Sequence, residues 1–166
     1  LPSGTNNLEP ELTLYYNSHL RHSPPGIVGN SWRITENYIQ RNTNFTHDNT
    51  NDDYFILVFN GDSHVLVNTI VFDGRFHTKI ETFFNIQQLS SSTNNSQSSY
   101  WILKTKDGTT YTYGYNSESE LNGTVNDLVW RWSLDSIQDI HGNTIFYSYR
   151  ETPFPGESGT VYLDNI

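Results

Sequence analysis

The sequence contains no cysteine and no methionine, and it contains no alanine either. The absence of cysteine excludes a disulfide framework, a thiolate metal site and a thiol nucleophile. Alanine favours helices, whereas β-branched and aromatic residues suit the pleated surface of a sheet, and Phe, Trp and Tyr make up 14% of this chain. The composition therefore predicts an all-β protein, and a length of 166 residues predicts a single domain.

Basic residues are also scarce. The chain has 9 Lys and Arg against 18 Asp and Glu, so its formal net charge is −9. Because the basic residues are scattered along the sequence, no run of them offsets the repulsion of phosphate backbones or anionic lipids. No apolar run reaches the roughly 20 residues of a membrane-spanning helix. We therefore expect neither a nucleic acid nor a membrane as a direct partner.

Short β-prone runs joined by pairs of Gly with Asn or Asp are the most regular feature of the sequence. These residues readily adopt the positive φ angles that tight hairpin turns need. The four pairs are Asn60-Gly61, Asp73-Gly74, Asp107-Gly108 and Gly142-Asn143. Four such turns in a chain of this length predict an architecture of antiparallel hairpins and meander sheets.

Alternation within the runs predicts what each face of a strand presents. Tyr111, Tyr113 and Tyr115 are expected to share one face, and Trp130 and Trp132 to share another. Tyrosine-rich faces indicate sheets that are covered by something semi-polar, such as another sheet or a neighbouring domain.

Two clusters raise the question of a metal site. His19 and His22 precede a Ser-Pro-Pro-Gly loop, but no third ligand and no HExxH pattern accompanies them. Asp48, Asp52 and Asp53 resemble the opening of a calcium loop but lack the glycine and glutamate of the EF-hand pattern. Both clusters are interpreted as solvated loops, and we expect no metal and no other cofactor.

Carbohydrate chemistry is an alternative that the aromatic content keeps open. Asp135, Asp139 and Glu151 are candidate carboxylates for a glycosidase, although the sequence cannot place two of them at a catalytic separation. Trp130 and Trp132 are candidates for stacking on a sugar, which makes a carbohydrate-binding or adhesive β-domain the second hypothesis.

A further and less favoured hypothesis is that the protein is an ADP-ribosyltransferase. Arg75, the Ser-Ser-Thr run at 91–93 and the Glu-Ser-Glu run at 118–120 follow the order of the motifs of that enzyme class. Both runs lie in polar loops rather than beside hydrophobic strands, so the pattern lacks the structural context that a catalytic motif needs. We therefore expect no enzyme activity and no catalytic residues.

The first third of the sequence resembles the SpvB-type region of bacterial virulence toxins, which include the B components of insecticidal toxin complexes. The resemblance begins with "LPSGTNNLEPELTLYYNS" and "PPGIVGNSW". The matching positions are Leu1, Pro2, Gly4, Leu8, Pro10, Leu12, Leu14, Tyr16, Asn17, Ser18, Gly26, Gly29 and Trp32. The sequence departs from the family where Asn30 and Ser31 separate Gly29 from Trp32, because the family sets a Gly directly before the Trp.

Two later segments extend the resemblance over nearly the whole chain. "YWILKTKDGTTYTYG" resembles a family hairpin that turns at Asp107 and Gly108, and "WRWSLDSIQDIHGNTIFYSY" resembles an element that contains Asp139, Gly142 and Asn143. These turn residues, with Tyr16, Asn17, Ser18, Gly26, Gly29 and Trp32, are the predicted structural motif. No Tyr-Asp dipeptide occurs, so any YD-repeat section of the family would lie beyond residue 166.

The resemblance implies structural work rather than catalysis. In this family the region helps to build a secreted β-sheet shell that encloses or delivers a C-terminal toxic effector. We therefore expect residues 1–166 to be one β-rich segment of a longer polypeptide. Its expected partners are other segments of the shell, a partner toxin subunit and the enclosed effector. An isolated segment of this kind is expected to expose unpaired sheet edges and to associate.

Overall fold

The computed structural model describes residues 5, 8–21, 28–46, 50–69, 73–90, 92–95, 98–123, 128–151 and 161–166. The part of the chain so described is built of strands and three short 3-10 turns. The turns are η2 (Ser18–Leu20), η3 (Thr50–Asp52) and η4 (Ser117–Ser119). The strands are β1 (Leu14–Tyr16), β2 (Trp32–Ile34), β3 (Tyr38–Asn42), β4 (Tyr54–Phe59), β5 (Asp62–Asn68), β6 (Arg75–Thr78), β7 (Asn85–Leu89), β8 (Tyr100–Lys104), β9 (Thr110–Tyr113), β10 (Glu120–Asn122), β11 (Val129–Gln138), β12 (Thr144–Phe146), β13 (Ser148–Glu151) and β14 (Val161–Asn165). The predicted all-β class is confirmed.

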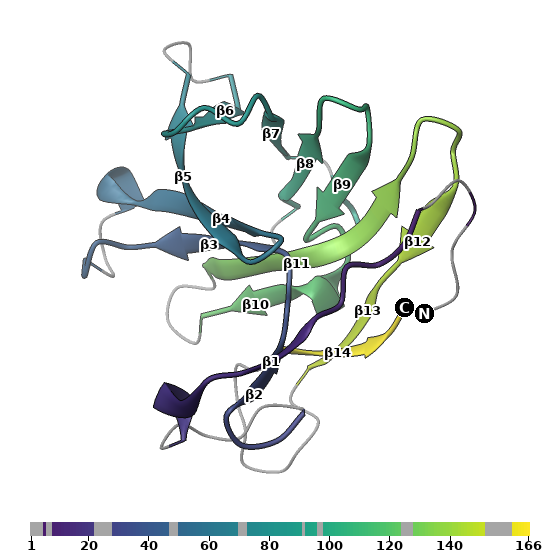
Figure 1. Ribbon diagram of the computed structural model, residues 1–166. Helices are drawn as coiled ribbons and strands as arrows, with labels where there is room; N and C mark the ends of the chain where they lie inside the picture. Colours follow the sequence, from purple (N-terminus) through teal and green to yellow (C-terminus); the bar gives the residue numbers. More distant parts are fainter. Residues whose placement is uncertain are drawn as a thin grey trace.

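Eight antiparallel strands close into a barrel (Figure 1). The order runs from β3 through β4, β5, β6, β7, β8 and β9, and β11 pairs with both β9 and β3 to complete the ring. Closure is possible because β11 is long: its first half pairs with β3 and β10, and its second half with β9 and β12. A closed ring leaves few strand edges unpaired, which protects a sheet from edge-to-edge association.

Tight turns at the predicted positions set the register of the barrel. Asn60 and Gly61 have φ angles of 52° and 89° and join β4 to β5. Gly74, Gly108 and Gly142 also have positive φ, in the hairpins β5–β6, β8–β9 and β11–β12. The strands on either side of all four predicted turns pair as hairpins, although residues 70–72 of the β5–β6 connection lie outside the described part of the chain.

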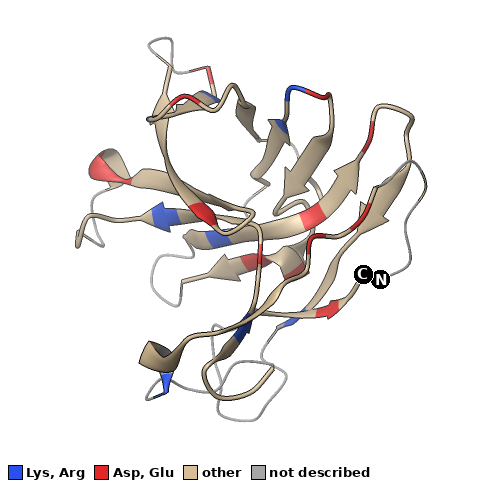
Figure 2. Ribbon diagram, in the orientation of Figure 1, with Lys and Arg blue, Asp and Glu red and all other residues tan. Residues whose placement is uncertain are grey.

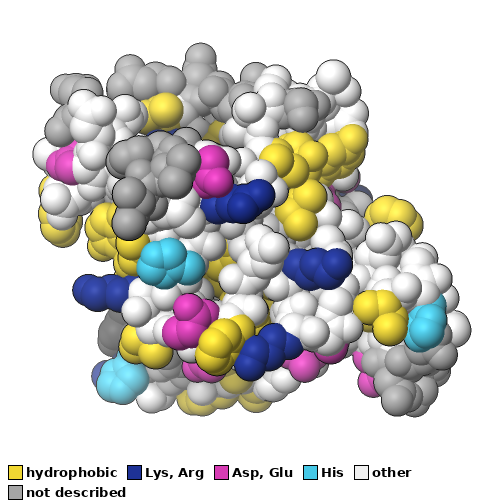
Figure 3. Space-filling model, turned by 90° about the horizontal axis from the view of Figure 1, so that it is seen from above, with side chains coloured by type: hydrophobic (Ala, Val, Ile, Leu, Met, Phe, Trp, Pro, Cys, Tyr) yellow, Lys and Arg dark blue, Asp and Glu magenta, His cyan; other side chains and the backbone are white. Residues whose placement is uncertain are grey.

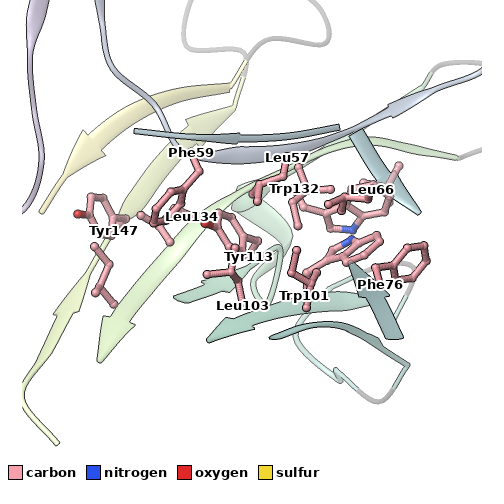
Figure 4. Close-up of a cluster of buried hydrophobic side chains, with 14 residues drawn as sticks. Leu57, Phe59, Leu66, Phe76, Trp101, Leu103, Tyr113, Trp132, Leu134 and Tyr147 are labelled. Carbon is pink, nitrogen blue, oxygen red and sulfur yellow. The ribbon is translucent and has the colours of Figure 1, made fainter. Parts of the chain in front are cut away.

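The core lies inside the barrel, where alternate residues of each strand point inward (Figure 4). The rings of Trp101 and Trp132 meet edge to face at 5.7 Å, and Phe55 contacts both. Edge-to-face packing places the positive ring edge on the negative face of the neighbour, which adds to the gain from burial. The fully buried side chains include Ile39, Leu57, Ile86, Trp101, Leu103, Tyr113 and Trp132.

The prediction that Tyr111, Tyr113 and Tyr115 share one face of a strand is wrong for Tyr115. Tyr113 is fully buried and Tyr111 packs beside it, but Tyr115 is 38% exposed and packs edge to face against Tyr100. The strand β9 ends at Tyr113, and Gly114 follows with a φ of 66°, so the alternation does not extend to Tyr115.

The pair Trp130 and Trp132 is divided in the same way. Opposite β10, the register of β11 steps from Arg131 to Val129, which makes Trp130 the extra residue of a β-bulge. Val129 and Trp132 therefore enter the core cluster, whereas Trp130 does not and lies over Gly123.

Two further pairs of strands extend the structure outside the barrel. β1 pairs with β2, and β13 pairs with β14, each as a two-stranded antiparallel sheet (Figure 1). None of the described helical turns has the length and apolar character of a membrane span.

Candidate functional site

The corner between β1 and β2 contains the first group of predicted motif residues. Tyr16 pairs with Trp32 across the two strands, and their rings meet edge to face at 5.3 Å. The backbone N–H of Asn17 donates to the carbonyl of Ser31 at 2.9 Å, and the Asn17 side chain accepts from the N–H of His19 at 3.0 Å. Asn17 therefore ends β1 and caps the turn η2, which Ser18 begins.

Gly29 and Ser31 shape the return of the chain into β2. Their φ angles are 107° and 65°, and Ser31 is buried. The two residues between Gly29 and Trp32 are thus accommodated by a second residue with positive φ. Two residues predicted to lie in this loop, His22 and Gly26, fall outside the described part of the chain.

The β1–β2 pair has an apolar face that is left uncovered by the described residues. Leu14, Tyr16 and Trp32 alternate onto one face of this sheet, and they are 55%, 58% and 40% exposed. Tyr15 and Arg33 alternate onto the opposite face. Aliphatic and aromatic side chains gain free energy when they leave water, so this face is suited to burial by another surface.

The other predicted motif residues form two neighbouring turns. The Asp107 carboxylate accepts hydrogen bonds from the hydroxyls of Thr105 and Thr109, which holds its pKa below the usual value. A Cβ on Gly108 would lie 2.6 Å from Cγ2 of Ile140, which belongs to the second turn.

In that second turn, Asp139 accepts from the backbone N–H groups of His141 and Asn143 at 2.8 and 2.9 Å and from the Asn143 amide at 2.6 Å. The hydrogen bond of the Asn143 side chain makes the largest contribution to a lowered pKa of Asp139. The carboxylate thus serves as a turn cap.

Asp135 belongs to a group of hydrogen-bonded polar residues, here called the polar seam, which also contains Asn116, Ser92 and Asn95. The sequence pattern does not predict this group. Asp135 lies where the register of β11 against β9 shifts, between Leu134 and Ser136. Its carboxylate accepts from the N–H of Tyr115 at 2.5 Å and from the Asn116 amide at 3.0 Å. Burial raises the pKa of Asp135 to about 6, although these hydrogen bonds act in the opposite direction.

The seam continues into neighbouring loops. The Ser92 hydroxyl donates to the carbonyl of Tyr115 at 2.8 Å, and the Asn95 amide donates to the carbonyls of Gly114 and Ser99. Beyond the end of β9, backbone carbonyl groups therefore accept hydrogen bonds from side chains rather than from the backbone of a neighbouring strand. The seam fastens the 92–95 loop to the barrel.

A buried ion pair occupies the interior of the barrel. Arg41 contacts Asp53 at 2.7 Å, and their side chains are 14% and 3% exposed. The Arg41 guanidinium also lies over the rings of Phe55 and Trp132 and donates to the carbonyl of Val129. Sequence reasoning placed Asp53 in a solvated acidic loop; that expectation is wrong, because Arg41 draws it inward.

Among the cavities formed by the described residues, two border residues that the sequence analysis or the polar seam singles out. One of about 750 Å³ lies between the β1–β2 pair, the barrel and β14, and its lining includes Tyr15, Arg33 and Arg131. Arg131 pairs there with Glu36 and stacks on Tyr38. The other, of about 380 Å³, is lined by the seam residues Asp135 and Asn116 together with Phe146.

Of the carboxylates considered for sugar hydrolysis, Asp135 and Asp139 do not form a catalytic pair. Asp135 is buried in the seam, and Asp139 caps a turn four residues further along, about 13 Å away in an extended strand. The side chain of Glu151 falls outside the described part of the chain. Trp132 is fully buried, so it cannot stack on a sugar as the carbohydrate-binding hypothesis requires.

The other candidate chemistries also have no assembled site among the residues that the structure describes. Glu120 is 1% exposed, and Arg75 projects from β6 as the partner of Asp73. Ser91 and Asp48 lie outside the described residues. Asp52 accepts from the Thr46 hydroxyl, and no group of three or more potential metal ligands occurs among the residues that the structure describes.

These observations define a class: a closed antiparallel barrel of eight strands, tied by polar side chains and flanked by two-stranded sheets. The family model described as Salmonella virulence plasmid 65kDa B protein, SpvB, matches residues 1–156, and the chain belongs to this family. The resemblance stated from the sequence is thereby confirmed. None of the curated proteins with which the sequence was compared matches it.

Solved structures share the fold. The N-terminal domain of effector protein SpvB from Salmonella typhimurium strain LT2 is similar with a TM-score of 0.70 at 20% identity, over 93% of this chain and 57% of that one. The crystal structure of TcdB2-TccC3 is similar with a TM-score of 0.73 at 20% identity, over 98% of this chain and 9% of that one. A Photorhabdus luminescens Tc holotoxin pore gives a TM-score of 0.67 at 16% identity, over 93% of this chain and 8% of that one. The chain thus spans little more than half of the first of these proteins and less than a tenth of the other two.

Proposed function

We propose that residues 1–166 form one non-catalytic segment in the wall of a secreted toxin shell, which encloses or delivers a C-terminal toxic effector. Membership of the SpvB family supports a role in a toxin, and the fold is shared with the TcdB2-TccC3 assembly. The wall segment would contact other segments of the shell protein or a partner toxin subunit. It needs no cofactor, nucleic acid or membrane for this task.

The observation that carries the proposal is the uncovered apolar face of the β1–β2 pair. No other strand of the described chain pairs with this sheet. Its side chains Leu14, Tyr16 and Trp32 therefore stay far more exposed than the residues of the core. A protein that worked alone would gain by burying such a face, whereas a wall segment needs it for its neighbour. The predicted motif residues Tyr16, Asn17, Ser18 and Trp32 then serve to hold this face in place.

The test uses the longest natural polypeptide that contains this chain. Replacing both Leu14 and Trp32 by Ser should leave the barrel folded but open the shell, so that added protease cleaves the C-terminal segment faster than in the unmodified protein. Phe45→Ser is a matched control, because Phe45 is 99% exposed but belongs to no such face. Equal protection of the C-terminal segment in all three proteins would refute the proposal.

Hydrogen exchange provides a second measurement. Amides of β1 and β2 should exchange quickly in the 166-residue chain and slowly in the longer polypeptide, since burial and pairing protect backbone amides. Unchanged exchange would show that the face stays uncovered.

A further inference from the structure

The cavity of about 380 Å³ lies where β9, β11 and β12 run side by side. Thr112, Ser136 and Phe146 are opposite one another on these three strands, and all of them line the cavity. The rest of the lining comes from the segment between β9 and β10, which includes Asn116, and from the first pair of residues of the β13–β14 sheet, which includes Ser148. A volume of this size accommodates a small organic group.

The lining contains one deeply buried carboxylate. Asp135 is 4% exposed, and its carboxylate accepts from two neutral donors, the N–H of Tyr115 and the Asn116 amide. No ion pair seen among the described residues includes it. A carboxylate buried to this extent is ordinarily matched by a cation, because neutral hydrogen bonds offset only part of the cost of removing a charge from water. The group is still ionised for the most part at neutral pH, since its pKa is raised only to about 6.

The charges around the cavity are negative. Neither lysine nor arginine occurs among the described residues of its lining, whereas Glu118 adds a second carboxylate. Figure 2 marks acidic positions on β11 and in the segment that leads into β10. The basic residues of the adjoining strands are already matched, because Arg131 of β11 pairs with Glu36 and Arg150 of β13 pairs with Asp164. The cavity is therefore complementary in charge to a cation.

The lysines of the chain lie at a different place. They follow β6, end β8 and lie in the turn after β8, and they are Lys79, Lys104 and Lys106. Figure 3 shows this end of the barrel from above, with Lys and Arg side chains spread among apolar ones. Asp135 lies beside the other end of β9, because its neighbour Leu134 pairs with Tyr113, the last residue of that strand. The buried carboxylate and the lysines are thus at opposite ends of β9.

Aromatic side chains border the cavity beside the carboxylates. Phe146 is 71% exposed and Tyr115 is 38% exposed, so both present ring surface to solvent, whereas Tyr147 is 8% exposed. Burial raises the pKa of Tyr147 to about 12, so its hydroxyl is neutral at physiological pH. The negative face of an aromatic ring attracts a cation, and the alkyl groups of an organic cation gain further from leaving water.

We propose that this cavity binds an alkylammonium group, with its positive charge beside the Asp135 carboxylate and its alkyl groups against Phe146 and Tyr115. Buried charge and ring surface in one cavity favour this class over a bare metal ion, which needs more oxygen ligands than two carboxylates supply. Small molecules such as choline and the side chain of lysine both carry such a group. The inference concerns a site within this chain and does not depend on the proposed shell.

Isothermal titration calorimetry of the 166-residue chain with choline tests the proposal. The matched control ligand is the neutral carbon analogue of choline, in which a quaternary carbon replaces the nitrogen. It has the same shape without the charge, so it should bind at least tenfold more weakly than choline. Equal affinity for the two ligands would overturn the proposal.

Substitutions locate the binding site. Asp135→Asn keeps the shape of the side chain but removes its charge, so it should weaken choline binding at least tenfold. Phe146→Leu should weaken binding severalfold, because it removes the ring but keeps an apolar side chain. Asp62→Asn and Phe45→Leu are matched controls on exposed residues that do not line the cavity, and they should leave the affinity unchanged. Unchanged affinity in Asp135→Asn, with the fold verified by thermal melting, would overturn the proposal.

The pH dependence of binding is a readout that a change in packing would not reproduce. Choline should bind about tenfold more weakly at about pH 5 than at about pH 7.5, because about a tenth of Asp135 is ionised one unit below its pKa. Tyr147 and Tyr149 stay neutral over this range, since burial raises the pKa of each. Glu118→Gln should leave the profile unchanged in shape. A profile that is flat down to about pH 5 would refute the role of Asp135.

Further ligands identify the source of the group. Tighter binding of choline than of N-acetyl-lysine amide would identify a small quaternary ammonium compound, and the reverse order would identify a lysine side chain; either order supports the proposal. Tighter binding of N-acetyl-arginine amide than of both would overturn it in favour of a guanidinium group. Displacement of choline by an equal concentration of calcium would overturn it in favour of a metal ion.

Discussion

Replacing Asp135 by Asn should change how stability depends on pH. The folded pKa of about 6 exceeds the unfolded value of 3.8 because burial disfavours the charged carboxylate. A shift of about 2 units corresponds to about 3 kcal/mol. The folded state therefore binds this proton more tightly than the unfolded state. The associated stability is fully present below pH 3.8 and is lost as the pH rises through about 6.

Asparagine resembles the protonated acid, so the variant escapes this loss. Its side-chain oxygen can still accept from the N–H of Tyr115, and the Asn116 amide can rotate to accept from the new NH₂ group. The difference in unfolding free energy, variant minus unmodified chain, should therefore be about 3 kcal/mol larger at pH 7 than below pH 4. A constant offset of about 1 kcal/mol from altered hydrogen bonds does not affect this change.

Urea denaturation of both proteins at intervals from about pH 3.5 to about pH 7.5, a range that brackets the folded and unfolded pKa values, measures the difference directly. Asp139→Asn is the control of opposite sign. The lowered pKa of Asp139 gives stability that is present above the unfolded pKa and is lost as the pH falls. A flat difference curve for Asp135→Asn would refute the reasoning, because it would mean that burial does not control this carboxylate.

Two further substitutions test the packing. Gly114→Ala should lower the unfolding free energy by about 3 kcal/mol, measured by urea denaturation, because its Cβ would lie 2.1 Å from Trp132 at a φ that disfavours alanine; an unchanged midpoint would contradict the close contact. Arg41→Ala should cost about 3 kcal/mol or more by leaving the buried Asp53 charge unpaired, whereas Arg41→Met combined with Asp53→Leu should recover most of this loss. Equal losses in the single and double variants would show that the charge of Asp53 is not the cause.

The hairpins could be predicted from the sequence because their turn chemistry is local. Asn60-Gly61 and Asp107-Gly108 specify positive φ within two residues, whatever surrounds them. Barrel closure could not be predicted in this way. Closure of the barrel depends on the pairing of Arg131 in β11 with Gln40 in β3. These residues are far apart in the sequence, and no local pattern indicates that they pair.

The buried polar groups were predicted only in part. Asp135 was a candidate carboxylate, but its place in the seam follows from a register shift that the sequence does not mark. No motif in the sequence points to Arg41. Its position two residues after the buried Ile39 was the available signal, because strand residues two apart share a face and the inward face of β3 therefore had to hold an arginine.

The alternation of inward and outward side chains fails at two places in this chain, and at each of them a glycine lies against a tryptophan ring. Trp132 lies against Gly114, and Trp130 lies against Gly123, so closely that a Cβ on either glycine would come within about 2 Å of the indole. The two contacts are made from β11 to segments on either side of η4, the end of β9 and the end of β10. Each large ring thus needs one position without a side chain, and together the two contacts fix the register of β11 against β9 and β10. A register slip of one residue would place a side chain beneath each indole, so the bulge at Trp130 is the geometry that satisfies both glycines at once.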